Sequence, residues 1–306
     1  MTSAKRAITG AVIGLILVSL GLLMIRTGNY GLTLFVALPV AVGAFGSWVM
    51  RPKTAVNAAI AGMVANLIAS LAFLASGFEG IICIAMALPL AIPLGALGGW
   101  LAYGPARKRT LVSGTAMLAL LPLGVGTLGF DITAKPDVFQ VRSSIEIAAP
   151  PERVWKHVVS FSELPPPDEW YFKTGIAYPM RARIDGTGPG AVRYCEFSTG
   201  PFVEPIQVWD EPHLLRFAVT QNPAPMNEWS PYANVMPRHL HGYLISKQGQ
   251  FLLTPLPNGH TLLEGTTWYQ HGLWPEVYWT VWSQAIIHRI HMRVLNHIKN
   301  LSESEG

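Results

Sequence analysis

Charged residues are scarce in this sequence. Lys, Arg, Asp and Glu make up 13% of the 306 residues, against about 25% in an ordinary soluble protein. Half of the residues are hydrophobic, which excludes two ordinary soluble domains and predicts a membrane portion. Cysteine is also rare, because the chain has only Cys83 and Cys195, in different parts of the sequence. A disulfide framework is therefore excluded.

The few charges are unevenly distributed. Residues 1–130 hold eight basic residues and one acidic residue, Glu79, for a net charge of +7. The other 176 residues hold 14 basic and 17 acidic residues, for a net charge of −3. The positive charge thus belongs to the apolar first part, where it indicates membrane orientation rather than nucleic-acid binding. All nine histidines follow residue 130, so we expect any chemistry in the second part.

Five uncharged apolar stretches in the first part are long enough to cross a membrane, which takes roughly 17–25 residues. They are predicted at residues 7–25, 31–50, 55–76, 80–103 and 111–130. Four spans are the alternative, because the last stretch is short and rich in glycine and proline. None of the five contains Asp, Glu, Lys, Arg or His, which disfavours a pump or an ion-coupled transporter.

Basic residues predict the orientation of these spans. Lys5 with Arg6, Arg51 with Lys53, and residues 107–109 occupy alternate connections. Positively charged loops resist translocation, so the N-terminus is predicted to be cytoplasmic. Five crossings place the second part on the extracytoplasmic side of the membrane, whereas four leave it in the cytoplasm. We expect an integral protein of the cell inner or plasma membrane whose second part is extracytoplasmic.

The second part, which follows a linker at residues 131–137, has the pattern of an α+β domain at residues 138–302. Residues 138–147 alternate as a strand does, and a helix with proline in its first turn follows at 153–159. Further strand-like runs, separated by turn residues, are predicted at 181–184, 191–198, 202–209, 214–219, 240–246, 250–254 and 260–270. A long amphipathic helix at 275–301 ends the domain.

The opening of this domain is similar to that of the START-like superfamily, also called polyketide cyclase-like or SRPBCC. The similarity lies in a strand–proline–helix signature at residues 144–155, followed by residues 158–161. It implies a helix-grip fold, in which a curved antiparallel sheet wraps around a long C-terminal helix and encloses a hydrophobic cavity. A lipid, a sterol or an aromatic polyketide would be the implied ligand. The resemblance supplies no catalytic residues, because the superfamily shares no catalytic motif.

The last predicted helix carries a histidine within its apolar stripe. His291 lies on the same face as Ile287 and Val294, with Arg289 and Arg293 opposite. Such a histidine is either a core residue hydrogen-bonded to a neighbour, or a group that points into a cavity as an acid, a base or a ligand contact. Both interpretations stay open at the level of sequence.

Other polar residues could join it. The candidate catalytic residues are His291, Glu196, Glu204 and Glu264, because each glutamate interrupts an apolar run, although we expect at least two to face outward. The candidate ligand contacts are His239, His241, Tyr243, Gln284, His288, His291, Trp229 and Trp268. On a strand, His239 and His241 would share a face, but this pair alone is weak evidence for zinc, so no metal and no cofactor are predicted.

A long apolar loop at residues 221–237 is predicted to cover the mouth of the cavity. The leading functional hypothesis is membrane-anchored binding, transfer or sensing of a lipid or other hydrophobic small molecule, with the bilayer as partner and no nucleic acid. One alternative is a cyclase, dehydratase or hydrolase that uses His291 and a glutamate as acid and base. Another is a ligand-dependent sensor or scaffold. The sequence lacks GxSxG, CxxC, HExxH and phosphate-loop motifs, so nucleophilic and nucleotide mechanisms have no support.

Overall fold

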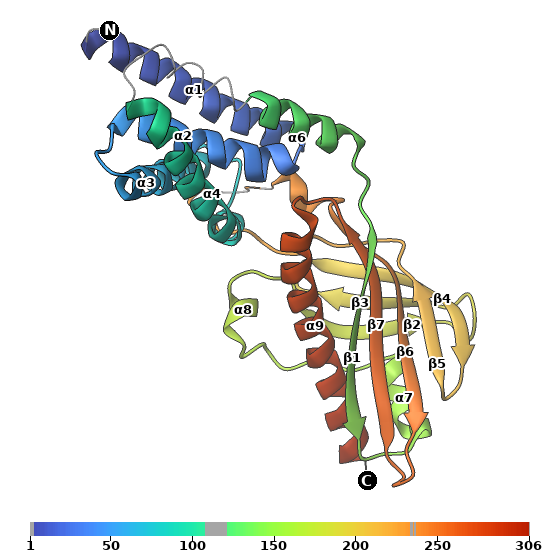
Figure 1. The fold of residues 1–306 in the computed structure, drawn as a ribbon. Helices are drawn as coiled ribbons and strands as arrows, with labels where there is room; N and C mark the ends of the chain where they lie inside the picture. The colour runs from blue at the N-terminus through green and yellow to red at the C-terminus, as the bar shows by residue number, and fades with distance from the viewer. Residues whose placement is uncertain (1–2, 108–120, 233–234, 236, 306) are drawn as a thin grey trace. The chain divides into compact units, whose positions relative to one another are not determined.

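The structure, a computed structural model, describes residues 3–107, 121–232, 235 and 237–305. The chain forms two compact units (Figure 1). A helical unit comprises Met1–Lys135 together with Glu228–His239 and Gly272–Pro275, and a sheet unit comprises Pro136–Asn227, Leu240–His271 and Glu276–Gly306. Two short segments from the second half of the chain therefore belong to the helical unit.

The helical unit contains the apolar stretches. Its elements are α1 (Ser3–Thr27), the π-helical η1 (Thr33–Ala37), α2 (Leu38–Met50), α3 (Ala55–Ala75), α4 (Ile81–Arg107) and α6 (Leu121–Thr133). Four helical stretches are long and apolar enough to cross a membrane: Ile8–Thr27, Thr33–Met50, Ala55–Ala75 and Ile81–Tyr103. They coincide with the first four predicted spans. The fifth, at 111–130, falls largely on residues 108–120, outside the described part, and stays a prediction.

Glycines allow α2, α3 and α4 to pack with their backbones in contact. A Cβ atom added to Gly43 of α2 would lie 2.1 Å from the carbonyl oxygen of Gly95 in α4, and one added to Gly62 of α3 would lie 2.0 Å from that oxygen. Asn66 of α3, which is buried, donates hydrogen bonds to the carbonyls of Pro39 and Gly62. Such small-residue contacts and interhelical hydrogen bonds are typical of helices that associate in a bilayer.

Polar contacts identify the two ends of this bundle. At one end, the Tyr103 hydroxyl of α4 donates to the carbonyl of Lys53, which follows α2. At the other end, the Asp131 carboxylate of α6 accepts from the backbone N–H groups of Leu32 and Thr33, which precede α2. Tyr103 and Asp131 therefore lie at opposite ends of the bundle.

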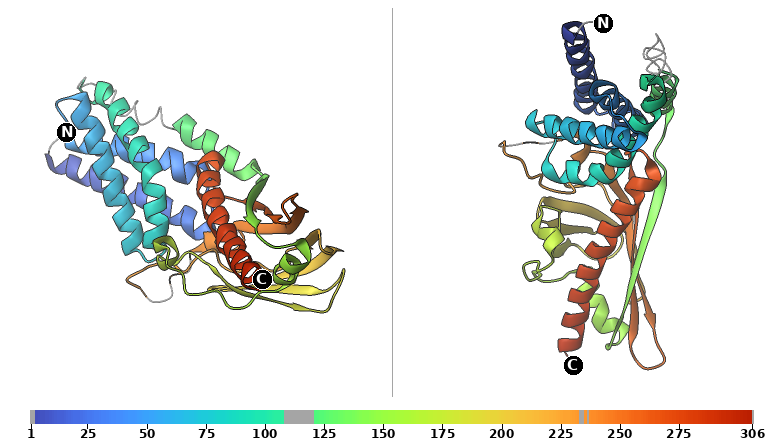
Figure 2. Two further views of the ribbon diagram at one scale, coloured as in Figure 1. Left: turned by 90° about the horizontal axis from the view of Figure 1, so that it is seen from below. Right: turned by 60° about the vertical axis from the view of Figure 1, so that its left-hand side comes forward.

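The sheet unit is an antiparallel sheet that curls around a helix (Figures 1 and 2). Its elements are β1 (Val138–Ile147), α7 (Pro151–Val159), α8 (Trp170–Lys173), β2 (Pro179–Asp185), β3 (Val192–Phe197), β4 (Gly200–Asp210), β5 (Leu214–Ala218), β6 (Leu244–Pro255), β7 (Thr261–His271) and α9 (Glu276–Ser304). The seven strands have the order β1-β7-β6-β5-β4-β3-β2. This is the predicted arrangement, a membrane-type helical region followed by a curved sheet that grips a C-terminal helix.

One predicted strand boundary is wrong. The runs 240–246 and 250–254 were expected to be separate strands, but β6 continues through both and shifts register between Ser246 and Gln248. Gly249 was interpreted as a turn residue between two strands. In the structure it lies within β6, where it allows a neighbouring side chain to pack closely. A Cβ atom there would lie 2.5 Å from the ring of Phe217 on β5, so only glycine lets that ring lie against β6.

The apolar stripe of α9 is buried as predicted, with Ile287, Val294 and Ile298 all in the core. The opposite face is less exposed than the sequence indicates. The Arg293 side chain is only 8% exposed, because its guanidinium lies over the rings of Phe172 and Tyr178. The irregular segment around α8 therefore covers this side of α9.

Candidate functional site

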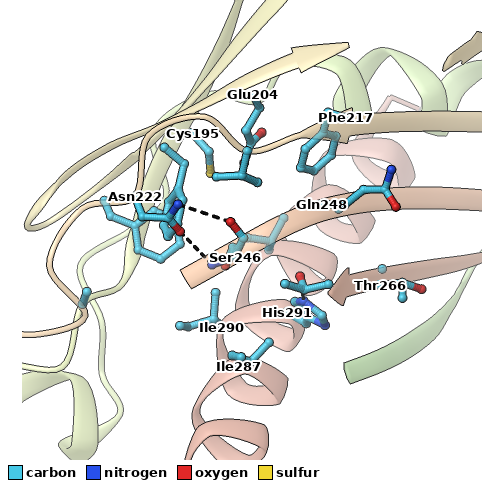
Figure 3. Close-up of a pocket in the computed structure, with 18 of the residues that line it drawn as sticks. Cys195, Glu204, Phe217, Asn222, Ser246, Gln248, Thr266, Ile287, Ile290 and His291 are labelled. Atoms are coloured by element: carbon cyan, nitrogen blue, oxygen red, sulfur yellow. Dashed lines mark hydrogen bonds between the residues drawn. The ribbon is translucent and has the colours of Figure 1, made fainter. Parts of the chain in front are cut away.

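A cavity of about 140 Å³ lies within the sheet unit, between the sheet and α9. Most of its wall is apolar. Aromatic and aliphatic side chains come from β3, β4, β5, β6 and α9, and from the residue that follows β5: Phe197, Phe202, Phe217, Val219, Phe251, Ile287, Ile290 and Val294. Asn222–Pro225 contribute a further part of the wall, so the start of the loop predicted as a cover does line the cavity. Figure 3 shows Ile287, Ile290 and His291 on α9, with Ser246 and Gln248 on the strand beside them.

The size of this cavity limits its occupant. An engineered apolar cavity of about 150 Å³ in another protein stays dry and binds benzene. A cavity of about 140 Å³ therefore accommodates one aromatic ring or a comparable short chain.

A buried ion pair lies in the cavity wall. Arg193 and Glu204 are 1% and 6% exposed, and Nη1 of Arg193 donates to the Glu204 carboxylate. Nε of Arg193 donates to the carbonyl of Val159 at 3.2 Å. Burial raises the pKa of Glu204, and the charge of Arg193 opposes that shift. Arg193 and Glu204 are thus a buried pair of opposite charges in a mostly apolar wall.

Alternation along β3 places Arg193 inside. Arg193, Cys195 and Phe197 line the cavity, while Glu196, one residue out of phase, pairs with Arg181 at 2.7 Å and with Arg183 at 3.5 Å on the other face. The sequence analysis missed Arg193. The signal was present, because in the predicted strand 191–198 it is the single charge in the row of Ala191, Cys195 and Phe197.

His291 lines the cavity and is held by hydroxyl groups. Its Nδ1 lies 3.2 Å from Ser143 Oγ, and its Nε2 lies 2.7 Å from Thr267 Oγ1. Ser143 Oγ also lies 2.7 Å from Nδ1 of His288. Burial lowers the pKa of His291 to about 4, and His288 acts in the same direction. His291 is therefore a neutral, hydrogen-bonded residue at pH 7, which fits a cavity-lining role and makes it a weak base.

The buried neutral His291 predicts a loss of stability in mild acid. Its pKa is about 6.5 unfolded and about 4 folded, so the unfolded state binds more protons between these pH values. Stability should fall as pH drops from 6.5 to 4, by up to about 3 kcal/mol from this residue. In urea unfolding at pH 7 and 4.5, His291→Gln should lose less stability than the wild type. The exposed His241→Gln should match the wild type, and equal losses in all three proteins would contradict the assignment.

One buried polar atom of the cavity lining is unsatisfied. Nη2 of Arg193 has no hydrogen-bond partner among the residues that the structure describes. Arg193 lines the cavity. A buried donor without an acceptor costs about 1–3 kcal/mol, so a ligand oxygen that accepts from Arg193 would recover that free energy.

The other predicted catalytic residues separate into two groups. Glu204 lines the cavity, as does His291. Glu196 and Glu264 do not belong to its lining: Glu196 pairs with the arginines of β2, and Glu264 lies 3.3 Å from the largely exposed Arg142. Two of the three glutamates thus face away from the cavity.

Most predicted ligand contacts lie elsewhere. Gln284 and His288 are exposed positions on α9, and Trp268 is a half-buried residue of β7 outside the cavity lining. Trp229 is 53% exposed in a segment of the helical unit. His241 is exposed, and Tyr243 is half-buried just before β6.

The strand predicted to hold His239 and His241 is wrong at that position. Arg238–Leu240 form a short 3₁₀ helix, η2, and β6 begins at Leu244. His239 belongs to the helical unit, where Nε2 of its ring lies 2.7 Å from Sγ of Cys83. The two histidines therefore do not share a strand face, because Gly242, with a φ of 78°, turns the chain before β6 starts.

Comparisons with known proteins bear on the sheet unit. Residues 138–242 match the family model described as polyketide cyclase / dehydrase and lipid transport, which is less than half of the chain. No characterised protein matches the sequence closely enough to count as a relative.

Three solved structures illustrate the structural matches. A protein from Nitrosospira multiformis is 18% identical, with a TM-score of 0.35 over 55% of this chain and 98% of that one. A norcoclaurine synthase mutant from Thalictrum flavum, in complex with a transition-state analogue, is 14% identical, with a TM-score of 0.36 over 56% and 99%. An aromatase/cyclase from Streptomyces sp. R1128 is 14% identical, with a TM-score of 0.33 over 55% and 96%. At these values the matches carry no argument about function, and the similarity that stands is that of residues 138–242 to the cyclase and lipid-transport family.

Proposed function

We propose that the sheet unit binds a small apolar or aromatic molecule with one hydrogen-bond-accepting oxygen, which it draws from or delivers to a membrane that holds the helical unit. The observation that carries this proposal is the unsatisfied Arg193 Nη2 in a mostly apolar cavity wall. The match of residues 138–242 to a family described by polyketide cyclisation and lipid transport supports a ligand of this class.

The ion pair favours a neutral oxygen over a carboxylate. Glu204 already neutralises Arg193, so a second anion beside it would meet repulsion that the buried site does not screen. A ketone, ester or hydroxyl oxygen can accept from Arg193 without adding charge. The ligand we propose is therefore an uncharged molecule of about one ring, or the uncharged end of a larger amphipathic molecule.

Binding is better supported than catalysis. Both ring nitrogens of His291 are within hydrogen-bond distance of hydroxyl groups, and its lowered pKa makes it a poor general base near neutral pH. A pure binder should retain most of its affinity in the His291→Ala variant, whereas an enzyme should still bind but lose turnover. The sensor alternative requires a partner whose association depends on the ligand.

Matched uncharged probes test the proposed ligand class. Acetophenone and ethylbenzene have similar shapes, but only acetophenone carries an acceptor oxygen. Delipidated full-length protein should prefer acetophenone by about tenfold, since a hydrogen bond to a charged donor contributes roughly 1.5–3 kcal/mol. The Arg193→Met, Glu204→Leu double variant should lose this preference and still bind ethylbenzene. Calorimetry measures both affinities, with protein-free micelles as the control, and no preference in the wild type would refute the proposed role of Arg193.

The ends of the bundle support an extracytoplasmic sheet unit. Tyr103 contacts the end that carries Lys53, whereas Asp131, just before the sheet unit, contacts the other end at Leu32. Tyr103 ends the fourth long apolar helix, and Asp131, near the last residue of the helical unit's first segment, lies at the opposite end of the bundle from Lys53. With the basic connections in the cytoplasm, we propose that the chain leaves the helical unit on the extracytoplasmic side.

Cysteine labelling in intact cells tests this orientation. Cys195 is unsuitable, because it is buried and burial raises the pKa of its thiol to about 12. Thr187→Cys, in the exposed turn after β2, should react with a membrane-impermeant maleimide in intact cells, and Lys53→Cys only after permeabilisation. The wild-type protein gives the background from its native cysteines. The reverse pattern would place the sheet unit in the cytoplasm.

A further inference from the structure

A cluster of metal-binding side chains lies in the helical unit, apart from the cavity. It joins the connection between α3 and α4, the first turn of α4, and the segment Glu228–His239, which the same unit contains. The cluster consists of Glu79, Cys83 and His239, whose ligand atoms all lie within 4.8 Å of one another. His239 is 156 residues from Cys83 in the sequence, so the fold, and not chain proximity, brings the three side chains together.

The geometry of the cluster is closely defined. Sγ of Cys83 lies 2.7 Å from Nε2 of His239, and Nδ1 of His239 lies 3.6 Å from an oxygen of Glu79. The other oxygen of Glu79 accepts a hydrogen bond of 2.7 Å from the Tyr30 hydroxyl. The Glu79 and His239 side chains are 6% and 11% exposed, so a carboxylate and an imidazole are held together away from bulk water.

Glu79 is a buried acidic residue in a part of the chain that is otherwise basic or uncharged. It is the single acidic residue among residues 1–130, and it is 4% exposed. A buried carboxylate requires a counter-charge or a metal ion. The nearest basic group is His239 itself, because the described contacts of Glu79 are with Tyr30 and His239.

We propose that Glu79, Cys83 and His239 form a binding site for a divalent transition-metal ion that accepts thiolate and imidazole ligands, such as Zn²⁺. Thiolate, imidazole and carboxylate are the side chains that hold zinc in proteins. The Glu79 carboxylate and the Cys83 thiolate balance the charge of a divalent ion, and neutral His239 adds none. The Glu228 carboxylate, which interacts with the Cys83 side chain, adds further negative charge beside the site. Three protein ligands leave a fourth position for water or another ligand.

Metal binding replaces a proton. The Cys83 thiol loses its proton to solvent, and the Sγ···Nε2 contact is replaced by one metal–sulfur and one metal–nitrogen bond. Two tetrahedral ligands of zinc lie about 3.5 Å apart when the bonds are about 2.3 and 2.0 Å, so the 2.7 Å contact must open by side-chain rotation. Tyr30 would orient Glu79 from outside the ligand shell, a role that typically changes metal affinity by about 10- to 100-fold.

A neighbouring carboxylate holds the same segment in place. Glu228 accepts hydrogen bonds from the backbone N–H groups of Ile82 and Cys83 at 3.1 and 3.0 Å. The carbonyl of Trp229 accepts from the N–H of Ile81. These contacts hold Glu228 and Trp229 against the first turn of α4, and the contact of His239 with Cys83 brings the other end of the segment to the same turn. The three side chains are therefore neighbours without a metal, and metal binding requires only side-chain rotation.

Cobalt provides a direct test, because a Cys thiolate bound to Co²⁺ absorbs in the near ultraviolet and tetrahedral Co²⁺ absorbs in the visible. Metal-free full-length protein, purified in detergent, is titrated with Co²⁺ and then with Zn²⁺. We expect one Co²⁺ ion per chain, a thiolate charge-transfer band, and loss of both signals as Zn²⁺ displaces Co²⁺. A wild-type protein that gives no such band would overturn the proposal.

Variants assign the ligands. Cys83→Ser should abolish the charge-transfer band, His239→Gln and Glu79→Gln should weaken Co²⁺ binding more than about tenfold, and Tyr30→Phe should weaken it by about tenfold. His241→Gln, two residues from His239, is the matched control and should bind like the wild type. A band that survives in Cys83→Ser would assign the metal to Cys195 and refute the site. The Co²⁺ titration of the wild-type protein tests the site by itself, so the test remains valid if one of the variants fails to fold.

Discussion

Replacing Glu204 with leucine should lower the free energy of unfolding by about 3–5 kcal/mol, because it leaves the Arg193 guanidinium buried without its counter-charge. Arg193 is 1% exposed, and three phenylalanine rings, of Phe161, Phe217 and Phe251, lie 5.5 Å from it. None of these rings can replace a carboxylate. Urea unfolding of the full-length protein, followed by tryptophan fluorescence, measures the loss.

The partner variant separates a charge effect from a packing effect. Adding Arg193→Met to Glu204→Leu should restore most of the lost stability, since buried ion pairs are often replaced by apolar residues at little or no cost. Glu264→Leu is the control, because Glu264 pairs with the exposed Arg142 and such pairs contribute about 0–1 kcal/mol. A Glu204→Leu protein as stable as this control would show that the ion pair does not bear on folding.

The second large effect concerns binding. Gly265→Leu should reduce acetophenone affinity more than tenfold and leave stability unchanged or higher. A Cβ atom at Gly265 would lie 3.7 Å from both Leu295 and Phe251, which is ordinary contact, so the new side chain fits and fills the cavity that Gly265 lines. Filling an apolar cavity commonly stabilises a protein. Calorimetry gives the affinity, and urea unfolding gives the stability.

The neighbouring position controls for the substitution itself. Glu264→Leu places the same side chain one residue earlier on β7, on the face that carries the pair with Arg142. This variant should bind acetophenone like the wild type. If Gly265→Leu binds as well as Glu264→Leu does, then the ligand is held somewhere other than this cavity.

Much of the architecture was predictable because local patterns agree with the final packing. The alternation at residues 138–147 is that of β1, and Val141, Ser143 and Ile147 are buried on one face as expected. The buried face of α9 could likewise be predicted from its apolar stripe without knowledge of the tertiary structure. The limits of the four long apolar helices agree closely with those predicted for the first four spans, because an uninterrupted apolar stretch has no competing interpretation.

The failures arise where a distant contact decides the role of a residue. Gly249 is a turn residue by its type, but the ring of Phe217 across the sheet explains it. His239 resembles half of a strand pair, yet Cys83, 156 residues earlier, is its neighbour. No local pattern contains such a partner. The Arg193 and Glu204 pair was predictable only in part. Strand alternation indicates that Arg193 faces inward, but it does not identify Glu204 as its counter-charge.

The central claim, that the cavity between the sheet and α9 holds a small uncharged apolar or aromatic molecule, is tested most directly by identifying what co-purifies with the protein. Small molecules are extracted from wild-type and Gly265→Leu full-length proteins, purified in parallel in the same detergent, and compared by mass spectrometry. Our account predicts a molecule of about one ring, or an amphipathic molecule with an uncharged oxygen-bearing end, in the wild-type extract and its depletion from the Gly265→Leu extract. Identical extracts from the two proteins would contradict it.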